Sequence, residues 1–188
     1  YVLLAAAAQA TNEITIGPLL TNPVTRHPSV TASSIATIAE LAQGRTILGL
    51  GVGDTAVRLA GLRPARVSSL EASTKLIQSL LAGEKVDVNA RRPAFLPFAQ
   101  PVPIWIAAGG PRTLRMAGSV ADGVFIRVGT DIKNIALAVK EIQTGAEEAG
   151  RDPKEIRLGT VLHTVFHDDI EESLLMAKSM AAGYYEYS

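Results

Sequence analysis

The 188-residue sequence contains no cysteine, and this absence excludes disulfides, thiolate catalysis and cysteine-ligated zinc. Its 18 basic and 18 acidic side chains leave no net charge, whereas a nucleic-acid-binding protein usually needs a basic face. Every apolar run is shorter than the roughly 18 residues that span a membrane. These features favour one cytoplasmic globular domain over residues 1–188, acting on a small molecule, without a nucleic-acid, membrane or metal partner.

Catalytic motifs are also scarce. The sequence has neither the G-x-S-x-G turn of serine hydrolases nor the P-loop pattern. Of its histidines, His163 and His167 are four residues apart but lie in or after a predicted strand, and His27 lies in a different loop, so we expect no metal role for them. His27 precedes Pro28, which predicts a hydrogen-bonding role for its ring at the start of a helix. Because so few polar residues are candidates for catalysis, we expect a cofactor that carries the reaction itself.

Apolar runs alternate with helical patterns along the whole chain. The spacing predicts helices over 1–11, 29–42, 70–81, 111–121, 131–149 and 168–182, and strands over 14–20, 45–53, 103–110, 122–129 and 155–166. Ser68 or Ser69 is expected to cap the third helix and Asp131 the fifth. This order predicts a parallel sheet covered on both faces, either open or closed into a barrel. Five strand–helix pairs are too few for a complete barrel of about 250 residues.

Two glycine-bearing strand ends are candidate binding segments, because ligands of both architectures bind at the carboxyl ends of the strands. The stretch "GVGDTA", Gly51 to Ala56, matches a dinucleotide fingerprint, but the expected acidic partner, Glu71, lies in a predicted helix instead of ending a strand. The glycines could simply relieve crowding, or let a flat ligand lie against the backbone.

The second segment is "IAAGGPRTLRMAG", Ile106 to Gly118. Pro111 begins a helix here, and the free N–H groups of the helix would point back at the glycine turn, which favours an anion. Arg112 and Arg115 could add charge. A plain tight turn is the alternative.

These stretches, with the loop "TNPVTRHP" after the strand at 14–20, resemble the luciferase-like superfamily of flavin- and deazaflavin-dependent oxidoreductases. The runs "ITIGPLLTNPVTRHPSVTASSIATIAELAQGRTILGLGVGD" and "PVPIWIAAGGPRTLRMAGSVADGVFI" carry the resemblance, which is greatest to the coenzyme F420-dependent, methylenetetrahydromethanopterin reductase-like branch. The resemblance implies a TIM (β/α)8 barrel, here a fragment with about strands three to seven. It implies hydride transfer at C5 of F420 to a small organic substrate. An FMN-dependent monooxygenase and a non-catalytic flavin-binding relative are the alternatives.

The resemblance also implies a cofactor site. Leu19 and Leu20 match a bulge with a non-prolyl cis peptide behind the ring system, and Asn22 would reach the polar edge of the ring. Arg26, Arg63 or Arg66 would suit the polyglutamate tail of F420. The resemblance identifies no catalytic residue, and the open sheet edges favour a homodimer or higher oligomer. The residues expected to line the pocket or hold phosphate are Gly51, Gly53, Ala107, Ala108, Gly109, Gly110 and Pro111.

Overall fold

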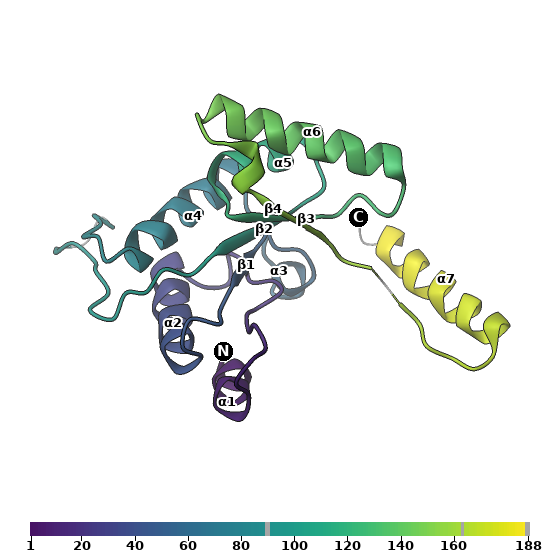
Figure 1. Ribbon diagram of the computed structural model, residues 1–188, viewed down its shortest axis with the longest axis horizontal. Helices are drawn as coiled ribbons and strands as arrows, with labels where there is room; N and C mark the ends of the chain where they lie inside the picture. The colour runs from purple at the N-terminus through teal and green to yellow at the C-terminus, as the bar shows by residue number, and fades with distance from the viewer. Residues whose placement is uncertain (89–90, 163, 187–188) are drawn as a thin grey trace.

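The computed structural model describes residues 1–88, 91–162 and 164–186. Its centre is a parallel sheet whose four strands lie side by side in chain order, as in a βα barrel (Figure 1). The strands are β1 (Leu48–Leu50), β2 (Ile104–Ala108), β3 (Gly123–Ile126) and β4 (Arg157–Thr160). The α-helices are α1 (Val2–Ala10), α2 (Pro28–Leu41), α3 (Thr55–Leu59), α4 (Val67–Leu81), α5 (Pro111–Val120), α6 (Ile132–Glu148) and α7 (Ile170–Glu186).

A bulged segment, residues 16–21, extends the sheet beyond β1. Ile16 pairs in parallel with Thr46, and Thr21 pairs with Leu50. The interval between the two pairs is therefore five residues in the bulged segment and four residues in the segment that contains β1. The peptide bond between Leu19 and Leu20 is cis, as the family resemblance predicted. The prediction of a continuous strand over 14–20 was therefore wrong, because the extra residue interrupts regular pairing.

The two faces of the sheet differ. One face, called here the outer face, carries large aliphatic side chains that are almost completely buried. They share one core with buried residues of α2, α4, α5 and α6. The other face, called the inner face, carries mostly small residues. The prediction of helices over both faces was thus wrong, because all four of these helices contribute to the same core. The outer-face side chains are Leu48, Leu50, Ile104, Ile106, Val124 and Ile126.

Most helix predictions are confirmed, including Pro111 as the first residue of α5. Asp131 caps α6, accepting hydrogen bonds from the backbone N–H groups of Lys133 and Asn134 at 2.9 and 3.0 Å. The prediction that a serine caps α4 was wrong, because the helix already begins at Val67 after Arg66, without a side-chain cap. The short α3 and a 3-10 turn over Pro153–Glu155 were not predicted.

The C-terminal part of the chain is more exposed than the rest. The predicted strand over 155–166 is short, and the side chains of Arg157, Leu158 and Thr160 in β4 are exposed. Figure 1 shows α7 beyond the sheet and apart from α5 and α6. Among the helices of the described residues, none is long and apolar enough to cross a membrane.

Candidate functional site

The bulge lies against glycines of β1 and of the turn that follows it. The N–H of Gly49 donates to the carbonyl of Pro18 at 3.1 Å, and the N–H of Gly51 donates to the carbonyl of Thr21 at 3.0 Å. A Cβ added to Gly49 would lie 2.5 Å from the Pro18 oxygen, and one added to Gly51 would lie 3.1 Å from a methyl of Leu20. The bulge can therefore cover the inner face of this strand because these residues lack side chains.

Asn22 follows the bulge and is 8% exposed. Its side-chain oxygen accepts hydrogen bonds from the N–H groups of Val24 and Thr25 at 3.0 and 2.9 Å, and from the Thr25 hydroxyl at 3.1 Å. A Cβ added to Gly53, whose φ is +85°, would lie 3.2 Å from the Asn22 side chain. Asn22 thus holds its own loop through an Asx turn, and its predicted contact with a cofactor stays a prediction.

The start of α5 has the geometry that an anion site needs. A Cβ on Gly109 would lie 2.6 Å from the carbonyl oxygen of Arg127, so close approach of β3 requires glycine there. Gly110 is the N-cap, makes no side-chain capping bond, and has no other atom within 4 Å of an added Cβ. The first-turn N–H groups of Arg112 and Thr113 therefore point toward an exposed, side-chain-free turn at the positive end of the helix dipole.

The bulge and the start of α5 lie at the same edge of the sheet. Thr21 pairs with Leu50, and Leu50 pairs with Ile106, so the end of the bulge is level with the middle of β2. Because adjacent strands are about 4.8 Å apart, Thr21 lies about 10 Å across the sheet from Ile106, and the start of α5 lies four to five residues further toward the carboxyl edge. The residues that were predicted to bind the cofactor thus belong to the bulge and its loop, to the turn after β1, or to the end of β2 and the start of α5: Leu19, Leu20, Asn22, Gly51, Gly53, Ala107, Ala108, Gly109, Gly110 and Pro111.

The remaining predicted residues lie outside this group. His27 is the N-cap of α2, and its Nδ1 accepts from the Ser29 N–H at 3.3 Å, which confirms the structural role. Glu71 lies on α4, as predicted, and pairs with Lys75 at 2.6 Å. His167 accepts from the Asp169 N–H at 3.0 Å, and His163 lies outside the described residues.

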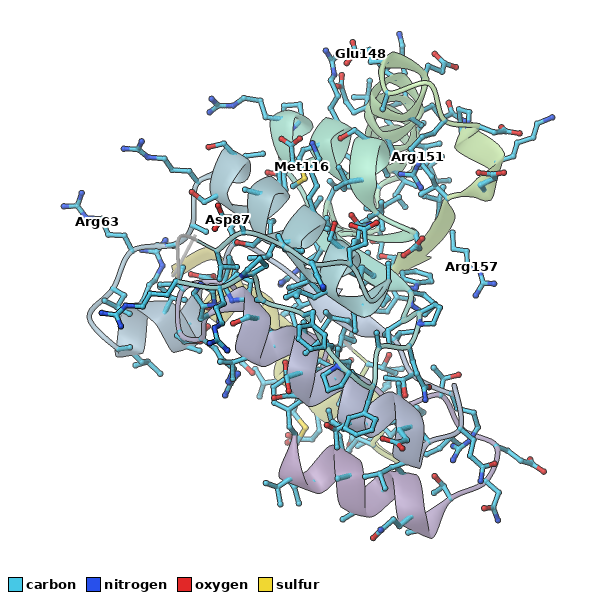
Figure 2. The ribbon with its side chains drawn as sticks, turned by 90° about the vertical axis from the view of Figure 1, so that its left-hand side faces the viewer. Arg63, Asp87, Met116, Glu148, Arg151 and Arg157 are labelled. Atoms are coloured by element: carbon cyan, nitrogen blue, oxygen red, sulfur yellow. The ribbon has the colours of Figure 1, made fainter. Side chains whose placement is uncertain are left out.

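The arginines considered for an anionic tail point in different directions. The guanidinium of Arg26 lies over the Tyr1 ring, 5.1 Å from its centroid. Figure 2 shows Arg63 extending outward from the body of the molecule. Arg115 pairs with Glu141 at 2.9 Å and with Glu148 at 3.5 Å on the helix side of the sheet. Of the two arginines predicted to add charge at the start of α5, Arg112 is the second residue of the helix, whereas Arg115 is held by these carboxylates.

Two surface hollows lie away from the candidate site. One, of about 640 Å³, lies at the amino ends of the strands and includes Pro103, Asp122 and Arg157. The other, of about 450 Å³, lies between α4, α5 and α6 and includes Met116 and Glu148, both labelled in Figure 2. None of the predicted cofactor-binding residues lines either hollow.

Sequence reasoning missed two aromatic residues on the inner face, Trp105 and Phe125. Their ring centroids are 4.6 Å apart, with an angle of 31° between the planes. The alternation of buried and half-buried residues along β2 places Trp105 opposite the outer-face isoleucines. The pattern could have been found in "PIWIAAGG", where a large aromatic residue stands between aliphatic neighbours and small residues follow.

The sheet is part of a TIM-type (β/α)8 barrel. Its parallel strands follow chain order, its helices cover the outer face, and small residues gather at the carboxyl edge. The family model described as luciferase-like monooxygenase matches residues 1–187, and the chain belongs to this family. The predicted fold class and family are thereby confirmed.

Individual relatives place the chain near F420-dependent proteins. It is 41% identical, over 83% of its length, to a 5,10-methylenetetrahydromethanopterin reductase of Methanolobus tindarius, and 33% identical, over 90%, to an F420-dependent hydroxymycolic acid dehydrogenase of Mycobacterium tuberculosis. Each match covers 50% of the relative, so the chain spans about half the length of these curated proteins. The solved F420-dependent tetrahydromethanopterin reductase of Methanopyrus kandleri superposes with a TM-score of 0.79 at 29% identity, over 92% of this chain and 56% of that one.

Proposed function

We propose that the chain is the cofactor-binding part of an F420-dependent oxidoreductase that transfers a hydride between the deazaflavin and a small organic substrate. The observation that carries the proposal is the shared edge, where a bulge over glycines and an uncapped helix N-terminus follow neighbouring strands, with β1 between the bulge and β2. A planar ring with an anionic tail suits that pair of features. The hydroxymycolic acid dehydrogenase and the solved reductase are both named as F420-dependent, which supports coenzyme F420 in particular.

Each segment has a distinct role in this proposal. Leu19 and Leu20 support the ring from behind, while Gly51 and Gly53 line the same pocket at the end of β1, where Leu20 and Asn22 pack against them. The backbone from Ala107 to Pro111 holds the phosphate, because Gly110 leaves the first N–H groups of α5 accessible. The deazaflavin, when bound, supplies the hydride chemistry at its C5. The chain contributes binding and orientation, which can lower a barrier by several kcal/mol.

Titration of the protein with F420 and with FMN tests the proposal, with binding followed by the fluorescence of each cofactor. We expect F420 to bind with the lower Kd. Tighter binding of FMN would instead favour an FMN-dependent monooxygenase. Failure to bind either would leave a non-catalytic relative and would overturn the proposal.

A matched pair of variants tests the phosphate segment. Gly110→Asp would place a carboxylate at the N-cap of α5, where it caps the helix and repels an anion. Gly110→Asn would cap the helix similarly without charge. We expect at least tenfold weaker F420 binding in the aspartate variant than in the asparagine variant. Equal affinities would contradict the predicted place of the phosphate.

The further predictions concern organisation. We propose that residues 1–188 belong to one barrel domain of a cytoplasmic protein that forms a homodimer or higher oligomer. β4 is an edge strand of the sheet, which supports additional strand pairing there. Light scattering on the purified protein tests the oligomer, and a mass equal to one chain would contradict it. Cell fractionation tests the location.

A further inference from the structure

The inner face of the sheet is organised in two levels. Register places Gly49, Trp105, Gly123 and Arg157 side by side at the lower level. The upper level, two residues or about 7 Å nearer the carboxyl edge, contains Ala107, Phe125 and Gly159. Gly51, two residues after Gly49, continues this upper level beyond β1.

Trp105 lies across its neighbour on the lower level and reaches the upper level at β4. An added Cβ on Gly123 would collide with the fused atoms of the indole, and one on Gly159 would lie 3.2 Å from the indole Cζ3. The indole therefore crosses from β2 over the bare backbone of β3 toward β4. Phe125 contacts it with a centroid separation of 4.6 Å, which fixes the edge of the ring that faces the upper level.

On the β1 and β2 side, the upper level carries little side-chain bulk. Ala107 presents a methyl group and Gly51 presents none. The position above Gly159 is filled, because an added Cβ there would lie 3.3 Å from the ring of Phe125. Leu20, whose methyl group lies 3.1 Å from the Cβ position of Gly51, stands at one side of this level, and Phe125 stands at the other. A flat group that enters from the carboxyl edge between these two side chains would meet its first large obstacle at Trp105.

We infer that Trp105 is a positioning residue that forms the floor of the site and sets how deeply a planar heterocycle enters it. The inference rests on the proposed function and deepens it, since it specifies what the ring rests on as well as what lies behind it. The glycines at positions 123 and 159 serve this role by giving the indole room to lie flat.

Two substitutions separate a floor from a general packing role. Trp105→Phe keeps an aromatic surface and removes an indole N–H that is buried without a hydrogen-bond partner in the described part of the chain. Trp105→Ala removes the floor. Affinity is measured by the fluorescence of F420 itself, so the readout does not depend on tryptophan. Phe98→Ala, which truncates an aromatic side chain that is 70% exposed, is the matched control.

We expect F420 affinity within threefold of wild type for Trp105→Phe and Phe98→Ala, and at least tenfold weaker binding for Trp105→Ala. Thermal unfolding shows whether each variant is folded. A second measurement needs no truncated variant: the near-UV circular dichroism of Trp105, taken as wild type minus Trp105→Phe, should change when F420 is added, because a ring stacked on the indole perturbs its transitions.

The two proposals fail in different ways. If the wild type binds neither F420 nor FMN, the proposed function is wrong. If the wild type binds F420 but the dichroism of Trp105 is unchanged, or if a folded Trp105→Ala variant binds within threefold of wild type, the function stands and the floor is wrong.

Discussion

The two faces of the same strands carry side chains of different size and burial. On the outer face, β1, β2 and β3 present large aliphatic side chains that are at most 4% exposed, and helices cover them. On the inner face, the same strands present glycine or alanine at most positions, with Trp105 and Phe125 as large exceptions. Ile106 and Ala107 are neighbours in β2, yet they belong to these two different environments.

The difference teaches that stability and binding are separated across the thickness of one sheet. Outer-face residues contribute through the area they remove from water, roughly 25 cal/mol per Å². Inner-face residues contribute by what they leave open, because a missing side chain admits the bulge, the indole and, in our proposal, the cofactor. Substitutions on the two faces should therefore affect different measurements.

The largest expected effect is on the outer face. Ile106 is completely buried, so Ile106→Ala should lower the free energy of unfolding by about 2–5 kcal/mol, because it removes apolar contacts and leaves a cavity. Chemical denaturation measures the change. Leu158→Ala, on the same face but 46% exposed, is the control and should cost much less. Similar costs for both variants would break the comparison.

A smaller loss is expected where the bulge crosses β1. Gly49→Ala should destabilise the protein by about 1–3 kcal/mol, because the new Cβ would lie 2.5 Å from the Pro18 carbonyl and force the bulge outward. Gly110→Ala is the matched control, since its Cβ meets no atom within 4 Å. Denaturation curves for the two variants should differ, and coincident curves would show that the bulge adapts freely.

His27 lies on neither face of the sheet, and we expect its substitution to change stability by an intermediate amount. His27→Ala should lower stability by about 1 kcal/mol, because the ring no longer accepts the Ser29 N–H at the start of α2. His27→Asn should restore most of the loss, since asparagine is a favourable N-cap. Thermal unfolding measures both variants, and an equal loss in both would mean that the cap contributes nothing.

The smallest stability effect, but a large effect on binding, is expected at Ala107. Ala107→Leu adds a side chain above Trp105 at a half-buried position, so stability should change by less than about 1 kcal/mol. F420 affinity should nevertheless fall at least tenfold. Ala72→Leu, an exposed alanine of α4, is the control for both measurements. Unchanged F420 affinity in Ala107→Leu would show that the upper level of the inner face is not part of the binding site.

Much of the fold could be predicted from the sequence, because it depends on local patterns. Apolar spacing located the helices, and Pro111 and Asp131 marked two helix starts whose caps are set by the neighbouring backbone. The strand at 14–20 could not be predicted from its composition, since the extra residue of the bulge is specified by contacts with Gly49 and Gly51. The cis bond came from family resemblance alone.

The candidate site was predictable only in part. Glycine-rich strand ends point to close backbone approach wherever they occur, so the turn at Gly109 and Gly110 was found directly. Trp105 was not found, because its role depends on which residues of β3 and β4 stand beside it in register. The cap of α4 was misplaced for a related reason: α4 begins without a side-chain cap, so local capping chemistry gave no signal for Val67.

The uneven pairing of the bulge has one more consequence. Side chains of a strand alternate between faces, and an odd interval would normally send Ile16 and Thr21 to opposite sides. Their partners, Thr46 and Leu50, are an even number of residues apart. The extra residue therefore shifts the alternation by one position, so that Ile16 and Thr21 both point to the helix side. Leu20 then turns toward the interior. The alternation itself decides which side chain a ligand would meet.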